Sequence, residues 1–230
     1  MCLFRIIIPV FLLLCGLSAH AAGGHWATDD ATVVSPGQCE LELWDQRRDS
    51  ETSETVLSPV CNFGGPGDIE WTLALNHLRA GGDDALEAGL GAKHLVREIG
   101  DYDYGIGIAG GVGFSDERDR METAEVYVPF TLPFFDQRMH LHLNAGWEYD
   151  RRRANRHDAT WAVAMDMELW GRATLIGEVF GSDSGETAVQ GGWRYAFARW
   201  DATLDMSWLR QTGDDSDVWT TIALNIGFGS

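Results

Sequence analysis

The chain has 230 residues, and its 35 acidic and 17 basic side chains give a formal net charge of −18. This charge argues against a nucleic-acid-binding protein, which needs a basic face. The 27 glycines, 10 tryptophans and single lysine, Lys93, do not describe a helical bundle and favour a β protein with close-packed or membrane-facing strands. The longest apolar run, residues 6–14, is far shorter than the ~20 residues of a membrane-spanning helix.

The first 21 residues have the features of an export signal. Arg5 supplies a short positive region, residues 6–14 an apolar core, and residues 19–21 (Ala-His-Ala) a cleavage site. This pattern is typical of a Sec-type signal peptide, which is removed and does not belong to the fold. A lipoprotein signal at Cys15 is the alternative, but Leu14 stands where such signals carry a small residue.

The segment that follows the signal has no periodic pattern. Residues 22–36 begin Ala-Gly-Gly, and we expect them to form a flexible periplasmic lead-in to a barrel domain over residues 37–230. Cleavage of the signal leaves two cysteines, Cys39 and Cys61, in an oxidising compartment where a pair is expected to close.

From about Cys39 to Phe228, apolar side chains alternate with small or polar ones, as in strands with two different faces. Most segments have the length of a strand that crosses a bilayer, about 9–11 residues. We therefore predict an all-β fold, a transmembrane antiparallel up-and-down β-barrel of about 12 strands, within a range of 10 to 14. The predicted strands are residues 37–46, 55–63, 69–79, 86–97, 104–114, 122–134, 139–149, 159–170, 172–180, 187–197, 200–209 and 218–228.

A soluble β-sandwich or lipocalin-like barrel, with its apolar face buried as a core, is the alternative fold. Polar loops after the odd-numbered segments and mostly tighter turns after the even-numbered ones predict that both chain ends face the periplasm. Aromatic side chains fall where two lipid-interface girdles belong. These residues are Trp71, Tyr104, Phe114, Phe134, Trp147, Tyr149, Trp161, Trp193, Trp200, Trp208 and Phe228.

The two cysteines test the register of the first hairpin. If this hairpin is centred on Ser50, residues whose numbers sum to 100 lie opposite each other, and Cys39 faces Cys61. Opposed residues of paired strands have Cβ atoms about 4.5–5.5 Å apart, which is close to disulfide geometry. We therefore predict a Cys39–Cys61 disulfide that pins this hairpin.

The face opposite the apolar one is small and polar, and its acids outnumber its bases. In a wet lumen these acids would raise the local cation concentration, which predicts a narrow, cation-favouring path for small solutes or ions. A closed barrel, filled by side chains and salt-bridged across its core, remains the alternative. The predicted lumen residues are Glu40, Glu42, Glu70, Glu87, Lys93, Arg97, Glu125, His140, His142, Glu148, Asp166, Glu168, Glu178, Arg194, Asp201 and Asp205.

More specific sites have weaker support. His140 and His142 lie two apart on the lumen face, with Glu148 further along, but without a third defined ligand polar lining explains them better than a metal site. No serine of the mature chain lies in a Gly-x-Ser-x-Gly elbow or has an evident His–acid partner. We therefore expect a non-enzymatic protein with no catalytic residues and no cofactor.

A basic loop over residues 151–156 carries Arg151, Arg152, Arg153 and Arg156. It could hold lipopolysaccharide phosphates by bidentate contacts, and a solvated loop explains it at least as well. The expected partners are outer-membrane lipid, lipopolysaccharide and the barrel-assembly machinery, with no nucleic acid; the sequence names no solute.

Four stretches carry a resemblance to a known family: residues 36–42 (PGQCELE), 128–134 (VPFTLPF), 191–195 (GGWRY) and 224–228 (LNIGF). With them the chain resembles the small bacterial outer-membrane barrels known as transporter-like or phenol-degradation (MetA-pathway) proteins. This resemblance implies a barrel with a passage role and no established catalytic residues. We expect it in the outer membrane of a Gram-negative bacterium after Sec-dependent export. The alternative is a non-conducting structural or surface-binding barrel for adhesion or lipopolysaccharide contact.

Overall fold

The computed structural model describes residues 25–100, 103–116, 120–185, 187–197, 199–212 and 217–228. The predicted signal peptide and residues 22–24 of the expected lead-in lie outside these residues. The described part of the chain contains no helix of the length and apolar character needed to cross a membrane.

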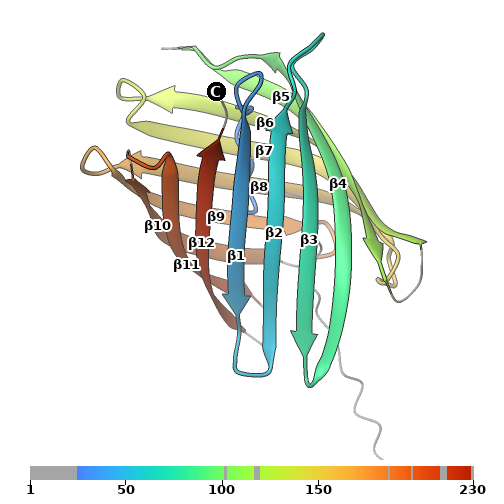
Figure 1. Cartoon of the computed structure of the whole chain (residues 1–230). Coiled ribbons are helices and arrows are strands. Elements are labelled where there is room, and N and C mark those ends of the chain that lie inside the picture. The colour runs from blue at the N-terminus through green and yellow to red at the C-terminus, as the bar shows by residue number, and fades with distance from the viewer. Residues whose placement is uncertain are drawn as a thin grey trace, which may run out of the picture.

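Twelve antiparallel strands pair in chain order, and β1 pairs with β12 to close the barrel (Figure 1). The predicted all-β antiparallel barrel of twelve strands is confirmed, and every predicted boundary lies within three residues of the observed one. The strands are β1 (Cys39–Arg47), β2 (Thr52–Asn62), β3 (Glu70–Ala80), β4 (Asp83–Arg97), β5 (Gly105–Ser115), β6 (Arg120–Phe134), β7 (Met139–Asp150), β8 (His157–Glu168), β9 (Ala173–Ser182), β10 (Thr187–Phe197), β11 (Ala202–Thr212) and β12 (Val218–Phe228).

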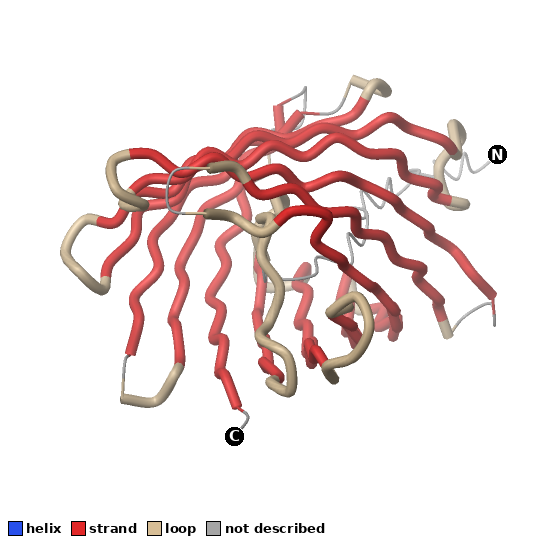
Figure 2. The backbone as a smooth tube through the Cα atoms, turned by 90° about the horizontal axis from the view of Figure 1, so that it is seen from above, coloured by secondary structure: helices blue, strands red, loops and turns tan. Residues whose placement is uncertain are grey.

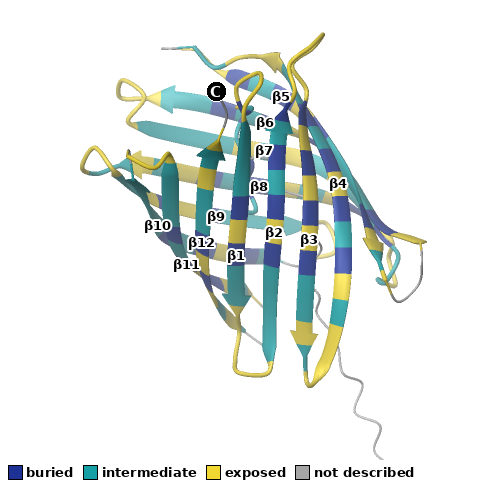
Figure 3. Cartoon of the chain, viewed as in Figure 1, coloured by how far each residue is buried: buried dark blue, intermediate teal, exposed yellow. Residues whose placement is uncertain are grey.

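The two faces of the barrel wall differ as the alternation predicts. In β3, the side chains of Trp71 and Leu75 are exposed on the outside, while Glu70, Thr72 and Asn76 are buried on the inside. Figure 3 shows the same alternation of exposed and buried positions along β2, β3 and β4. A soluble barrel would bury its apolar face, so this inverted pattern excludes the lipocalin-like alternative.

The first hairpin has the predicted register. Cys39 lies opposite Cys61, and Leu43 lies opposite Leu57. Cys39 and Cys61 form a disulfide, with their Cα atoms 4.1 Å apart. The predicted bond is confirmed, and it joins β1 and β2 at the barrel end where β1 begins and β12 ends, which we call the terminal end.

The predicted contrast in loop length is absent. At the terminal end the connections 63–69 and 98–104 are the longest in the described barrel, whereas at the opposite end two residues, Gly81 and Gly82, join β3 to β4. Both glycines have positive φ angles (61° and 95°), as a two-residue hairpin turn requires. Several strands extend beyond their predicted ends into residues that were expected to form loops. Loop length therefore does not indicate which end of the barrel faces the periplasm.

Candidate functional site

Residues 25–38, which we call the N-terminal segment, lie against the inner face of the barrel up to Val34, and residues 35–38 are exposed. Figure 1 shows the segment as a dark-blue coil beside β1, and Figure 2 shows a loop crossing the space that the strands enclose. Trp26, Asp29 and Ala31 are buried, with 3%, 0% and 0% of their surface exposed. Most of the described part of the expected flexible lead-in, up to Val34, therefore lies within the lumen.

Lumen side chains hold the backbone of the segment from Ala27 to Val34, which lies outside the strand ladders, so its polar groups must find other partners. The partners come from β2, β3, β6 and β9. The hydrogen bonds run from Ala27 N (2.9 Å) and Thr28 N (2.8 Å) to Glu178, from Ala31 N to Thr131 Oγ1 (2.9 Å), from Val34 N to Glu70 (2.6 Å), and from Asn62 Nδ2 to Val34 O (2.9 Å).

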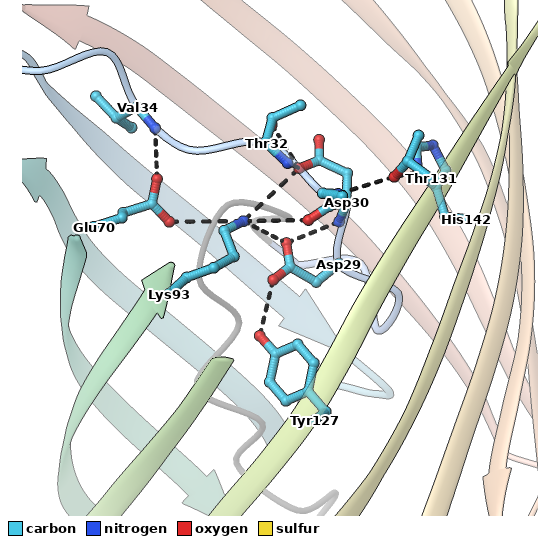
Figure 4. Close-up of polar contacts among 10 residues, drawn as sticks. Asp29, Asp30, Thr32, Val34, Glu70, Lys93, Tyr127, Thr131 and His142 are labelled. Atoms are coloured by element: carbon cyan, nitrogen blue, oxygen red, sulfur yellow. Dashed lines mark hydrogen bonds and ion pairs between the residues drawn. The ribbon is translucent and has the colours of Figure 1, made fainter. Parts of the chain in front are cut away.

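The single lysine of the chain ties the segment to the barrel wall (Figure 4). Lys93 Nζ on β4 donates a hydrogen bond to Asp29 Oδ1 at 2.9 Å, and carboxylate oxygens of Asp30 and Glu70 lie 3.8 and 3.7 Å away. Tyr127 Oη donates to the other oxygen of Asp29 at 2.9 Å. Lys93, Asp29 and Glu70 are fully buried, so their charges are balanced by one another in place of water.

The two carboxyl groups of the segment differ in acidity. Burial raises the pKa of Asp29 above its usual range, although the Lys93 ammonium opposes the rise. Burial also acts to raise the pKa of Asp30, but Lys93 and His142 outweigh it and hold that pKa below its usual range. Asp30 is therefore ionised at neutral pH.

A second anchor holds the start of the segment. Trp26 Nε1 donates to Asp205 Oδ2 on β11 at 3.1 Å. Arg194, which lies opposite Asp205 on β10, donates to both carboxylate oxygens, with Nε 2.9 Å from Oδ1 and Nη2 2.7 Å from Oδ2. The fully buried Asp205 carboxylate is thus neutralised by a bidentate arginine and also fixes the indole.

The half of the lumen away from the terminal end contains a cavity. Its empty volume is about 960 Å³, including open solvent, and His25 and Ala27 of the N-terminal segment form part of its wall. Three carboxylates line it, those of Glu54, Glu125 and Glu148, and no lysine or arginine is among the described residues around it. The three carboxyl groups therefore face a space whose described lining contains neither lysine nor arginine.

The basic loop over residues 151–156 folds against acids at the mouth of this cavity. Arg152 donates to Asp150 at 3.0 Å and to Glu87, across the mouth on β4, at 3.0 Å. Arg153 donates to Asp158 at 3.0 Å. Two of the four arginines in this loop therefore form internal ion pairs.

The structure places most of the predicted lumen residues on the inner face. Glu42, Glu70, Glu87, Lys93, Glu178 and Asp205 are buried there; Glu40, Glu125, His140, His142, Glu148, Asp166, Glu168 and Arg194 occupy inward positions and are half-buried.

Two predicted lumen residues lie elsewhere. The pairing of β4 with β5 shifts between Leu95 and Arg97, which places Arg97 opposite Ile106 of the apolar face. Arg97 is exposed and forms an ion pair with Asp103. Asp201 lies in the turn before β11, exposed and with a positive φ of 46°. A bulge reverses the alternation and a turn ends it, so a strict period of two misassigns both residues.

Apolar side chains also lie inside the lumen, where only small and polar ones were expected. Trp44, Val56 and Ala223 form a buried cluster on the inner face. Trp44 lies two residues from the polar lumen residue Glu42, and Val56 lies two residues from Ser58, so both pairs share the inner face. The period of two in the sequence could therefore have placed both apolar residues inside.

The predicted interface aromatics lie on the outer face near the two barrel ends. Trp71, Trp200 and Phe228 are at least half exposed near the terminal end, and Trp208 is half exposed toward the opposite end. Tyr104, Phe114, Phe134, Trp147 and Trp161 are 36–41% exposed. Tyr149 and Trp193 are half-buried.

Comparison with known proteins assigns the chain to a family. The family described as "Uncharacterised conserved protein UCP029691" matches residues 10–228. The chain belongs to this family. No curated protein matches it.

Solved structures with the same fold include two small porins. The "KdgM porin" has a TM-score of 0.66 at 8% identity, covering 82% of this chain and 99% of its own. The "NanC porin" has a TM-score of 0.61 at 9% identity, covering 82% of this chain and 98% of its own. At these identities the likeness shows the fold, a small porin-like barrel.

Proposed function

We propose that this protein is an outer-membrane barrel that gives small solutes or ions passive passage through a narrow, acidic, cation-favouring lumen. We also propose that the N-terminal segment, whose contacts lie in the terminal half of that lumen, closes it there. The apolar outer face and the aromatic side chains near both ends support a membrane location. We also propose that the chain is exported by a Sec signal and assembled by the barrel-assembly machinery. Its terminal end then faces the periplasm.

One observation carries this proposal: the lumen contains an acidic cavity and also an N-terminal segment that can be removed from it. Glu54, Glu125 and Glu148 give the cavity a negative field that attracts cations and opposes anions. Polar bonds hold the described segment in place, and its first covalent link to the barrel wall is the start of β1. The segment can therefore leave the lumen without unfolding a strand.

Planar-bilayer conductance of the refolded mature protein tests the proposal. We expect the full mature chain to conduct rarely and a variant lacking residues 25–36 to show frequent, stepwise, cation-selective openings. In that deletion background, Glu54→Gln, Glu125→Gln and Glu148→Gln together reduce the selectivity for cations. Silence of the folded deletion variant would overturn the passage function.

The second candidate is a non-conducting barrel that binds partners at its surface. The closed terminal half of the lumen favours it. Two results together would support this candidate. The folded deletion variant would show no conductance, and the protein would bind lipopolysaccharide in a way that is lost in Arg151→Gln/Arg156→Gln. We also propose that the chain is related to the MetA-pathway barrels. Transport of aromatic solutes by the deletion variant would test this relation.

A further inference from the structure

Three side chains with metal-binding atoms meet on the lumen face of β7 and β8. His140 and His142 are two residues apart on β7, so both rings project inward. Asp166 lies opposite His140 on β8, and its carboxylate reaches both rings. Oδ1 is 3.0 Å from His140 Nδ1, and Oδ2 is 2.7 Å from His142 Nε2.

These positions fit the first coordination sphere of a small cation. Metal-ligand atoms of the three residues all lie within 4.8 Å of one another. Ligands about 2.0–2.2 Å from a tetrahedral zinc ion are themselves about 3.3 Å apart, and the two Asp166–histidine contacts are close to this spacing. The three side chains would draw together from at most 4.8 Å to hold the ion in place of the bridging protons. We propose that His140, His142 and Asp166 bind a divalent transition-metal ion, with its remaining positions open to lumen water.

The donor set selects the class of ion. Two imidazoles and one carboxylate suit zinc, cobalt, nickel or copper, whereas magnesium and calcium prefer oxygen ligands alone. The side chains of His140, His142 and Asp166 are 25%, 12% and 23% exposed, so an ion can reach them. The Asp30 carboxylate interacts electrostatically with His142 and adds to the negative field.

A further hydrogen bond orients one of the ligands. Thr131 Oγ1 lies 2.9 Å from His142 Nδ1 and accepts the Ala31 N–H of the N-terminal segment at 2.9 Å. When the ion takes Nε2, Nδ1 carries the proton and donates it to the threonine oxygen, as metal-bound histidines commonly do. The proposed site is thus two hydrogen bonds from the segment that closes the lumen.

The test is a titration of tag-free, refolded mature protein with Co²⁺, followed by the visible absorption of the bound ion. We expect saturation at one equivalent and displacement by Zn²⁺ but not by excess Mg²⁺. His140→Gln, His142→Gln and Asp166→Asn each weaken Co²⁺ binding by about tenfold or more, and Thr131→Val weakens it by about tenfold. His157→Gln, at the opposite end of the barrel, is the matched control and leaves binding unchanged.

Each variant is first checked for the resistance of a folded barrel to detergent denaturation without heating. If one ligand variant fails to fold, the other two supply the same comparison. The absence of saturable Co²⁺ binding by folded wild-type protein would overturn the proposal. Unchanged affinity in the folded ligand variants, or an equal loss in His157→Gln, would also overturn it.

Discussion

The two halves of the lumen are built from the same twelve strands, yet they are filled differently. In the terminal half, carboxylate and hydroxyl groups such as Glu178, Thr131 and Glu70 accept hydrogen bonds from the N-terminal segment. In the other half, Glu54 and Glu148 face a cavity. The same polar wall therefore binds a stretch of backbone in one half of the barrel and borders a cavity in the other.

The buried and exposed ion pairs of the barrel sharpen this comparison. Lys93 and Asp29 in the terminal half are fully buried, whereas Arg79 and Asp84 at the opposite end have side chains that are 52% and 56% exposed. Removing one member of a buried pair typically costs about 3–5 kcal/mol, because a charge is left without a partner. An exposed pair contributes about 0–1 kcal/mol.

The largest effect is expected for Lys93→Met. This change leaves Asp29 and Glu70 buried without their cation and weakens docking of the segment by about 3 kcal/mol or more. We expect limited proteolysis of the folded protein to cut within residues 25–36 much faster than in wild type. Arg79→Met is the matched control and keeps the wild-type rate; equal rates in the two variants would show that the buried pair does not hold the segment.

A somewhat smaller effect is expected at the covalent link of the terminal end. The disulfide joins residues 22 positions apart, and closing a loop of this size stabilises a fold by about 3 kcal/mol. Cys39→Ser/Cys61→Ser should lower the free energy of unfolding in urea by up to that amount and leave the proteolysis of residues 25–36 unchanged. Faster proteolysis would mean that the disulfide, and not the lumen contacts alone, positions the segment.

The smallest effect is expected for Trp26→Phe. The substitution removes the indole hydrogen bond to Asp205 but keeps the bidentate Arg194 contact, so docking should weaken by about 1.5 kcal/mol. Proteolysis within residues 25–36 should accelerate about tenfold, less than in Lys93→Met. An acceleration as large as that of Lys93→Met would contradict the ranking of the two anchors.

The strands and the first register were predictable because a period of two specifies both, and the pair Cys39 and Cys61 fixed the hairpin independently. The position of Arg97 was not, because the register shift that moves it to the outer face arises in the pairing of β4 with β5. The grouping of Asp166 with His140 required the register between β7 and β8, which no cysteine pair fixes.

The closure of the lumen was also beyond the sequence analysis, for a different reason. Many contacts of the N-terminal segment use its backbone N–H groups, which every residue except proline carries, so these contacts leave no sign in its composition. Lys93 was the one available clue. A single lysine on the lumen face of an acidic barrel needs carboxylate partners, and Asp29 and Asp30 supply two of them from outside the strands.

The reactivity of the Lys93 amine tests the closed lumen most directly. Because the chain has one lysine, an amine-reactive ester can label only Lys93 and the chain's amino terminus, and peptide mass spectrometry separates the two. In folded wild-type protein we predict that Lys93 reacts about a hundredfold more slowly than in the folded variant lacking residues 25–36, as docking worth about 3 kcal/mol implies. Equal labelling rates in the two folded proteins would contradict the account.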